Sequence, residues 1–267
     1  MDTALDIWDP ETSLSLPHIR SQLIRLEDTV LFHLIERAQF PLNSTIYRPG
    51  ALPLPASHLS FMDWVLHAQE ELQSRIRRYQ SPDEYPFFDD AMATPILPEL
   101  QYPKVLWENE VNVNQELKRR YIEEVLPGVC RQTGRAERGE AQENYGSAAT
   151  ADVNCLQSLS RRVHFGKFVA ESKFRKETER FVGLIRSGDR KGIDEAITDK
   201  AVEAKVLERL RVKAEMYGAD PGMVGSEGAR KIQGEAVVGL YRDLVIPLTK
   251  VVEVEYLMAR LKGTEWE

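Results

Sequence analysis

Two long cationic side chains, Arg162 and Lys173, stand eleven residues apart in the segment LQSLSRRVHFGKFVAESK. Eleven residues come close to a whole number of helical turns, so one helix through this segment would carry both on one face, about 16 Å apart along its axis. The small residues Gly166 and Val169 lie on that face between them. Two cations leaning toward each other over a shallow floor could clamp a small dianion such as a dicarboxylate. The alternative is a solvated basic face, and the pattern alone does not exclude it.

A hydroxyl and a carboxyl group share a face in the segment VIPLTKVVEVEYL, where Thr249 and Glu253 are four residues apart. Valines flank Glu253 in the sequence. A carboxyl group in apolar surroundings has a raised pKa and can stay protonated, so Glu253 could donate a hydrogen bond to a ligand oxygen. The alternative is an exposed glutamate on an amphipathic helix.

Asp199 and Glu203 form a third group with the same four-residue spacing. They could present two carboxylates from one helical face to the same ligand. Two structural interpretations compete with this one. Asp199 could be the N-cap of the helix that follows, and Glu203 could pair with a lysine.

Other motifs carry less chemistry. The five histidines show no metal-binding spacing, and His164 is interpreted as a packed or surface residue. The glycine-rich stretch 222–228 follows no predicted strand and lacks the lysine of a P-loop, which indicates a flexible loop. Ser158 and Ser160 have no evident histidine and acid partners, so a hydrolase triad has little support. We expect no metal and no cofactor.

Composition places the chain among globular proteins: it has 267 residues, of which 42% are hydrophobic and 29% charged. The formal net charge of −7 argues against broad nucleic-acid binding, which needs a basic footprint. Cys130 and Cys155 form no disulfide framework. The N-terminal residues lack the pattern of a secretory signal, and no stretch approaches 18 uncharged apolar residues. These features predict a cytoplasmic protein with no membrane partner.

Helical periodicity dominates the chain, which predicts an all-α, multi-helix bundle in a single domain over residues 1–267. The expected helices cover residues 15–38, 60–79, 114 toward 127, 156–173, 174–186, 191–197, 199–217 and 235–261. Ser15, Ser60 and Asn114 are the candidate N-caps. Pro247 should kink the last helix. Residues 131–145 and 218–230 are expected to be surface loops.

Several long segments together resemble the fungal, all-helical chorismate mutases of the allosteric, yeast type. They include LQSLSRRVHFGKFVAESKF, KAVEAKVLERL, YGADP and VIPLTKVVEVEYLMARL, and the resemblance runs from about residue 13 to residue 261. It implies an all-α homodimer that rearranges chorismate to prephenate on the path to phenylalanine and tyrosine. The rearrangement is intramolecular and needs no metal, base or redox cofactor.

The resemblance also assigns roles to residues that match the family's motifs. Arg20 and Arg162 would bind the two carboxylates of the substrate, and Thr249 would assist. Lys173 would contact a carboxylate and the ether oxygen, and a protonated Glu253 would donate to that oxygen. Such preorganised donors would stabilise the negative charge that grows on the oxygen as its bond breaks.

Two acidic residues complete the implied catalytic set. Glu203 would hold the ring hydroxyl of the substrate. At Asp199 this sequence departs from a relative that has asparagine there, so this carboxylate must be protonated, turned away or paired.

The resemblance further implies regulation at a dimer interface, with tyrosine as inhibitor and tryptophan as activator. Adjacent arginines, Arg77 and Arg78, suit a carboxylate or phenol oxygen. The matching residues at an expected helix start, whose free N–H groups could take a carboxylate, are Asn144, Gly146, Ser147 and Thr150. The alternatives are a surface arginine pair and an ordinary N-cap. Glu143 stands where a relative has asparagine.

Two other classes of protein compete with an enzyme. One is a non-catalytic helical protein that binds aromatic amino acids, which should lack part of the set Arg162, Lys173, Glu203 and Glu253, whereas all four are present. The other is a plain helical scaffold, which has no reason to place cations and carboxyls in this pattern.

Overall fold

The computed structural model describes residues 8–132, 140–219 and 231–267, and within these ranges every regular element is helical. The α-helices are α1 (Pro10–Ser13), α2 (Leu16–Arg37), α3 (Phe61–Arg75), α4 (Asn114–Arg120), α5 (Leu126–Gln132), α6 (Tyr145–His164), α7 (Gly166–Lys176), α8 (Thr178–Arg186), α9 (Arg190–Ile197), α10 (Lys200–Gly218), α11 (Gly234–Leu240) and α12 (Ile246–Ala259). In the described residues, short 3₁₀ turns accompany them at Ser44–Tyr47, Arg78–Gln80, Asp89–Ala91 and Gln142–Asn144. The all-α prediction is confirmed.

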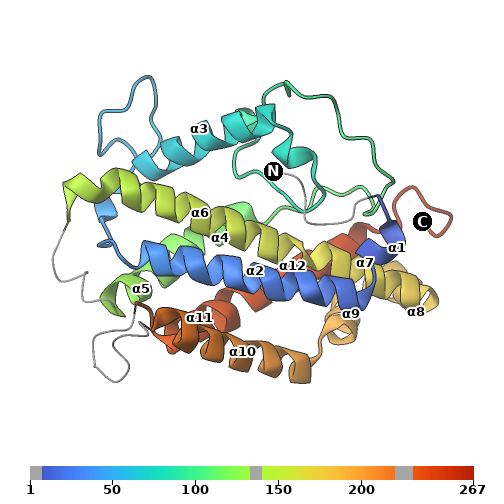
Figure 1. Cartoon of the computed structure of the whole chain (residues 1–267). Helices are drawn as coiled ribbons and strands as arrows, with labels where there is room; N and C mark the ends of the chain where they lie inside the picture. The colour runs from blue at the N-terminus through green and yellow to red at the C-terminus, as the bar shows by residue number, and fades with distance from the viewer. Residues whose placement is uncertain (1–7, 133–139, 220–230) are drawn as a thin grey trace.

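Helices α2 and α6 run side by side through the middle of the molecule (Figure 1). Helix α3 covers one side of this pair, α10 and α11 lie on the other, and α12 packs against α6, α7 and α9. The main core lies between these helices and includes Leu31 and Leu34 from α2 and Leu156 and Leu159 from α6, all fully buried. No helix in the described residues is long and apolar enough to cross a membrane.

Two wide π-helical turns are set into otherwise regular helices, at Tyr121–Val125 between α4 and α5 and at Tyr241–Val245 between α11 and α12. Each comes two residues before a proline, Pro127 or Pro247. Proline has no N–H to give to the carbonyl four residues earlier. In the second turn that carbonyl, of Asp243, instead accepts a hydrogen bond from Arg120 Nη2 at 2.8 Å. The irregularity predicted at Pro247 is therefore a π-turn, and the helix from Asn114 continues past Pro127.

The predicted caps fare differently. Ser60 caps α3 as expected, because its hydroxyl accepts the N–H of Asp63 at 3.1 Å. Ser15 precedes α2, but its hydroxyl donates to the carbonyl of Thr12 and caps nothing. The N-cap predicted at Asn114 is wrong because Val113 takes that position.

The helix expected over residues 156–173 is two helices, α6 and α7, which meet at Phe165. At the junction the N–H of Phe168 bonds the carbonyl of Phe165 three residues earlier, so the helical turn is tighter there. The two rings stack 4.7 Å apart and are buried. The helix expected over residues 60–79 ends at Arg75. The glycine-rich stretch 222–228 lies outside the described residues.

Candidate active site

A cavity of about 450 Å³ opens between α2, the α6–α7 junction, α10 and α12. It brings together all seven residues that the sequence singled out as catalytic: Arg20, Arg162, Lys173, Asp199, Glu203, Thr249 and Glu253. The small residues Gly166 and Val169 also line it, together with apolar side chains from α2 and α10. The cavity therefore combines an apolar wall with convergent charged and polar groups, as small-molecule sites do.

Arg162 is the least satisfied charged group in the cavity. Its side chain is 6% exposed, and its Nε and Nη1 atoms have no hydrogen-bond partner within the described residues. Behind it lies the buried ring of Tyr241, 5.8 Å from the guanidinium carbon. A buried cation without partners costs free energy, so this arrangement suits an anionic ligand that completes its hydrogen bonds.

Lys173 lines the cavity from near the end of α7. Its ammonium group donates to the carbonyl of Ile197, the last residue of α9. This bond fixes one N–H direction and leaves two for a ligand. Although the helix breaks at Phe165, Arg162 and Lys173 still line one cavity.

Glu253 is a buried acid on α12, 7% exposed and facing both cations of the clamp. Burial raises its pKa to about 8, and the positive charges of Lys173 and Arg162 oppose this rise only in part. The carboxyl is therefore largely protonated at neutral pH and can donate a hydrogen bond. The alternative interpretation of Glu253 as an exposed glutamate on an amphipathic helix is therefore wrong.

Thr249 lies one turn before Glu253 on α12, and its hydroxyl donates to the carbonyl of Val245 at 2.7 Å. While that bond holds, the hydroxyl can only accept a hydrogen bond from a ligand. A carboxylate has no proton to donate. To bind a substrate carboxylate, the Thr249 hydroxyl must therefore release the carbonyl of Val245, or a cation must bridge the hydroxyl and the carboxylate.

Both structural interpretations of the third pair hold in the structure. Asp199 caps α10, since its Oδ1 accepts the N–H groups of Ala201 and Val202 at 3.0 and 3.1 Å. Glu203 pairs with Lys250 at 2.7 Å. Both acids nevertheless line the cavity, so a structural role does not remove them from the site.

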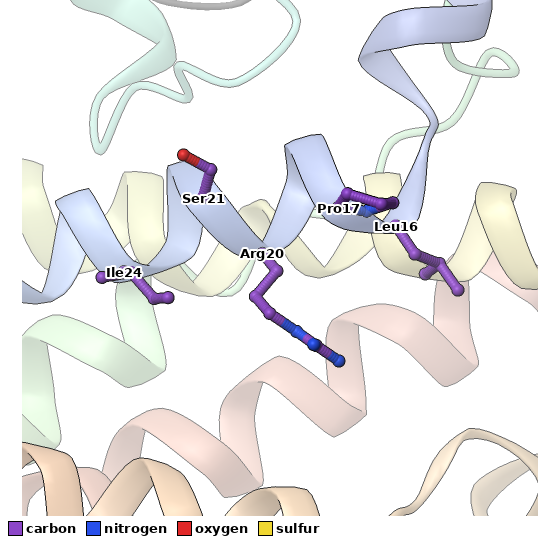
Figure 2. Close-up of a pocket in the computed structure, with 5 residues that line it drawn as sticks. All are labelled: Leu16, Pro17, Arg20, Ser21 and Ile24. Carbon is purple, nitrogen blue, oxygen red and sulfur yellow. The ribbon is translucent and has the colours of Figure 1, made fainter.

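Arg20 comes from α2 and stands at the rim. Its exposed side chain extends to the opposite side of the helix from Ser21 (Figure 2). It lines both the cavity and a shallow outer groove formed by Leu16, Pro17, Ser21 and Ile24. A guanidinium in this position can meet an anion at the cavity mouth.

Further charged residues, which the sequence patterns did not indicate, also line the cavity: Glu27, Lys205, Arg209 and Lys250. Glu27 is buried and accepts both Nε and Nη2 of Arg209, at 2.8 and 2.6 Å, as well as Lys213 Nζ at 3.2 Å. Lys250 could have been noticed because it adjoins Thr249 in the helix. Glu27 and Arg209 belong to a network between α2 and α10 that no local pattern reveals.

The charges of the lining do not cancel. Six basic side chains face four acidic ones. Of the acids, Glu253 is largely neutral, Glu27 and Glu203 are held in ion pairs, and Asp199 bonds helix N–H groups. The surplus of positive charge favours a ligand with two negative charges.

Ser160 contacts a histidine, because its Oγ lies 3.3 Å from His164 Nδ1, but no acid among the described residues bonds that imidazole, in line with the sequence expectation that a hydrolase triad is missing. That nitrogen also bonds the carbonyl of Ser160, and Nε2 accepts the N–H of Val113. Burial lowers the pKa of His164 to about 3. With both nitrogens occupied and no place in the cavity lining, the pair offers no general base. Within the described residues no cluster of histidine, cysteine and acidic side chains could hold a metal ion.

The two arginines of the candidate effector site differ in setting. Arg77 is half-buried, has a left-handed φ of 68°, and donates from Nη1 to the carbonyl of Pro98 at 2.7 Å. Arg78 is buried and bonds Gln157 at 2.9 Å and Glu84 at 3.0 Å. Of the two, Arg77 is the more accessible to a ligand.

The other candidate effector residues lie at the start of α6, where Gly146, Ser147 and Thr150 are exposed and Asn144 precedes the first turn. Gln157, which holds Arg78, is eleven residues further along α6 than Gly146, about 16 Å at the helical rise. One chain therefore keeps the arginine pair and the helix start apart.

The chain is similar to known proteins in both sequence and structure. The family model described as chorismate mutase type II matches residues 144–254. A chorismate mutase from Emericella nidulans is 64% identical over 268 residues, which cover 100% of both chains. A solved chorismate mutase from Candida albicans, in complex with L-Trp, has a TM-score of 0.91 at 45% identity and covers 98% of this chain and 97% of its own. AtCM1 with tyrosine bound in an allosteric site has a TM-score of 0.80 at 36% identity, with 95% and 99% covered.

Proposed function

This chain belongs to the chorismate mutase family, and from that premise we propose how its cavity rearranges chorismate to prephenate. The reaction breaks an ether C–O bond and forms a C–C bond within one molecule, so the enzyme is an isomerase. It must hold an extended dianion in a compact, reactive conformer and stabilise negative charge on the departing ether oxygen.

Substrate binding rests on the cations. Arg162, buried with two unpaired guanidinium nitrogens, takes one carboxylate in a charge-assisted contact. Arg20 meets the second carboxylate from the rim, and Lys173 uses its free N–H directions on a carboxylate and the ether oxygen. Since these groups come from α2, α6 and α7, they can pull the two ends of the substrate toward each other.

The barrier falls because two donors face the ether oxygen before the bond breaks. Lys173 carries a full charge, and neutral Glu253 offers its carboxyl proton. Loss of one such preorganised donor typically costs about 3 kcal/mol or more of activation free energy. Glu203, oriented by its ion pair with Lys250, accepts a hydrogen bond from the ring hydroxyl of the substrate. Asp199 keeps its hydrogen bonds to the N–H groups at the start of α10 and contributes negative charge to the cavity without contacting the substrate.

The observation that carries this proposal is the buried, unpaired guanidinium of Arg162 beside the buried acid Glu253. The decisive experiment follows loss of chorismate and formation of prephenate with the purified chain. An Arg162→Ala variant should lose at least a hundredfold in kcat/KM. Arg180→Ala, which removes an exposed arginine paired with Glu177, serves as control. Absence of turnover in the natural chain, or equal activity in the Arg162 variant, would contradict the proposal.

We also propose that the chain is a homodimer regulated by tyrosine and tryptophan. The arginine pair and the start of α6 are apart in one chain, so a ligand that uses both must lie between two copies. Exposed apolar residues lie near the end of α3, next to the arginines in the sequence: Leu72, Ile76, and Ile96, whose N–H bonds the carbonyl of Arg75. The relatives solved with tryptophan and with an allosteric tyrosine support this reading.

The test combines light scattering for mass with turnover in the presence of each amino acid. Tyrosine should inhibit, tryptophan should activate, and Arg77→Ala should weaken both effects while leaving basal turnover intact. A monomer, or no response to either amino acid, would refute the regulatory proposal. A cytoplasmic location stays a prediction. So does a single functional domain, which is supported by a cavity lined by residues from Leu16 to Glu253.

A further inference from the structure

Gly166, the first residue of α7, touches α12 at the two residues that act in the cavity. A Cβ atom on Gly166 would lie 3.0 Å from Thr249 Cγ2, 3.1 Å from Glu253 Cγ and 3.2 Å from the carbonyl oxygen of Thr249. All three distances are shorter than an ordinary van der Waals contact. The absence of a side chain here therefore sets how closely α7 approaches the catalytic segment of α12.

The α6–α7 junction is anchored to a third segment of the chain. Lys167 Nζ donates to the carbonyl of Val111 at 2.6 Å, and His164 Nε2 accepts the N–H of Val113 at 3.1 Å. Phe168 is fully buried. The junction is thus held from outside by the segment around Val111, and any added volume must be absorbed on the side of α12.

The α12 side is equally constrained. The hydroxyl of Thr249 is tied to Val245, which orients the Thr249 methyl toward Gly166. Next to Glu253, Val252 is fully buried, and so is Tyr256 one turn later. A displaced backbone would disturb this packing, so the flexible side chain of Glu253 would move first.

We propose that Gly166 is a positioning residue that fixes the Glu253 carboxyl at the depth where it is both protonated and aimed at the ether oxygen. The proposal rests on the function proposed for Glu253 above. A methyl group at residue 166 would push the Glu253 side chain aside and narrow the cavity floor. The displaced carboxyl would meet more water and ionise more readily.

The experiment compares Gly166→Ala with Gly183→Ala. Gly183 lies within α8, is exposed, and has no atom within 4 Å of its added Cβ. Alanine is the better helix former, so neither variant should suffer from helix propensity. Gly166→Ala should lower kcat at least tenfold and move the alkaline limb of kcat/KM to lower pH, and Gly183→Ala should change neither.

A second variant separates positioning from packing. Thr249→Ser removes the methyl nearest to the added Cβ but keeps the hydroxyl, so in the Gly166→Ala background it should recover part of kcat and move the alkaline limb part of the way back. Coupling in this double-mutant cycle supports the proposal. Additive effects, a natural pH profile in Gly166→Ala, or failure of both variants to fold would overturn it. Lack of chorismate turnover in the natural chain would instead refute the proposed function.

Discussion

Replacing Glu253 by glutamine tests the neutral acid directly. With a pKa of about 8, roughly nine-tenths of the free enzyme carries the protonated form at pH 7 and about one-tenth at pH 9. The kcat/KM of the natural chain should therefore fall about tenfold per pH unit above pH 8. Glutamine donates at every pH, so Glu253→Gln should remove this fall.

Substrate binding sharpens the expectation. A dianion near Glu253 disfavours its ionisation, so the alkaline limb of kcat should lie at higher pH than that of kcat/KM. The assay is the initial rate of chorismate loss from pH 5 to pH 10 at saturating and subsaturating substrate. An unchanged alkaline fall in Glu253→Gln would refute the reasoning, because another group would then control the rate.

Stability supplies a readout that is independent of turnover. Between pH 4.5 and about 8 the folded chain keeps the Glu253 proton and the unfolded chain releases it, so the free energy of unfolding falls as pH rises. One pKa unit corresponds to about 1.4 kcal/mol, which limits the total contribution to roughly 5 kcal/mol. Urea unfolding of Glu253→Gln should lack this fall, and a difference from the natural chain that is constant with pH would contradict the raised pKa.

Three further substitutions follow from the same contacts. Arg162→Met should abolish turnover yet raise the free energy of unfolding by about 1 to 2 kcal/mol, because it removes a buried, unpaired cation. Activity assays and thermal denaturation check the two effects, and a variant less stable than the natural chain would contradict the reasoning. Asp199→Asn should keep the cap and the melting temperature but lower KM for chorismate, since asparagine caps as well and removes a negative charge; a raised KM would argue for a ligand role. Burial lowers the pKa of Lys167 to about 7, so stability should rise between pH 7 and about 10, and urea unfolding of Lys167→Met should show no such rise.

The sequence predicted the cavity well because helical spacing places residues on faces. Thr249 and Glu253 share a face through their four-residue spacing alone, and the valines beside Glu253 indicated its raised pKa. The resemblance to a family joined these faces into one site, which periodicity could not do. Features that depend on residue spacing within a single helix could thus be predicted from the sequence.

Contacts between distant segments were not predictable in this way. Asn114 has the chemistry of an N-cap, but its side chain is held by the carbonyls of Tyr85 and Pro86, almost thirty residues earlier. Likewise, the partner of Glu203 is Lys250, which lies on another helix. Local preference was outweighed by tertiary hydrogen bonds that no spacing rule encodes.

The π-turn at Tyr241–Val245 determines the direction in which the side chains of α12 point. In a regular helix, Thr249 lies eight residues after Tyr241, and its side chain would point about 80° away from the direction of the Tyr241 side chain. The turn closes with the N–H of Ile246 on the carbonyl of Tyr241, five residues earlier, and so absorbs one residue without advancing the helix. Tyr241 behind Arg162 and Thr249 in the cavity wall can then point the same way. If the same residues wound as a regular α-helix, Thr249 and the acid one turn after it would be rotated away from the cavity.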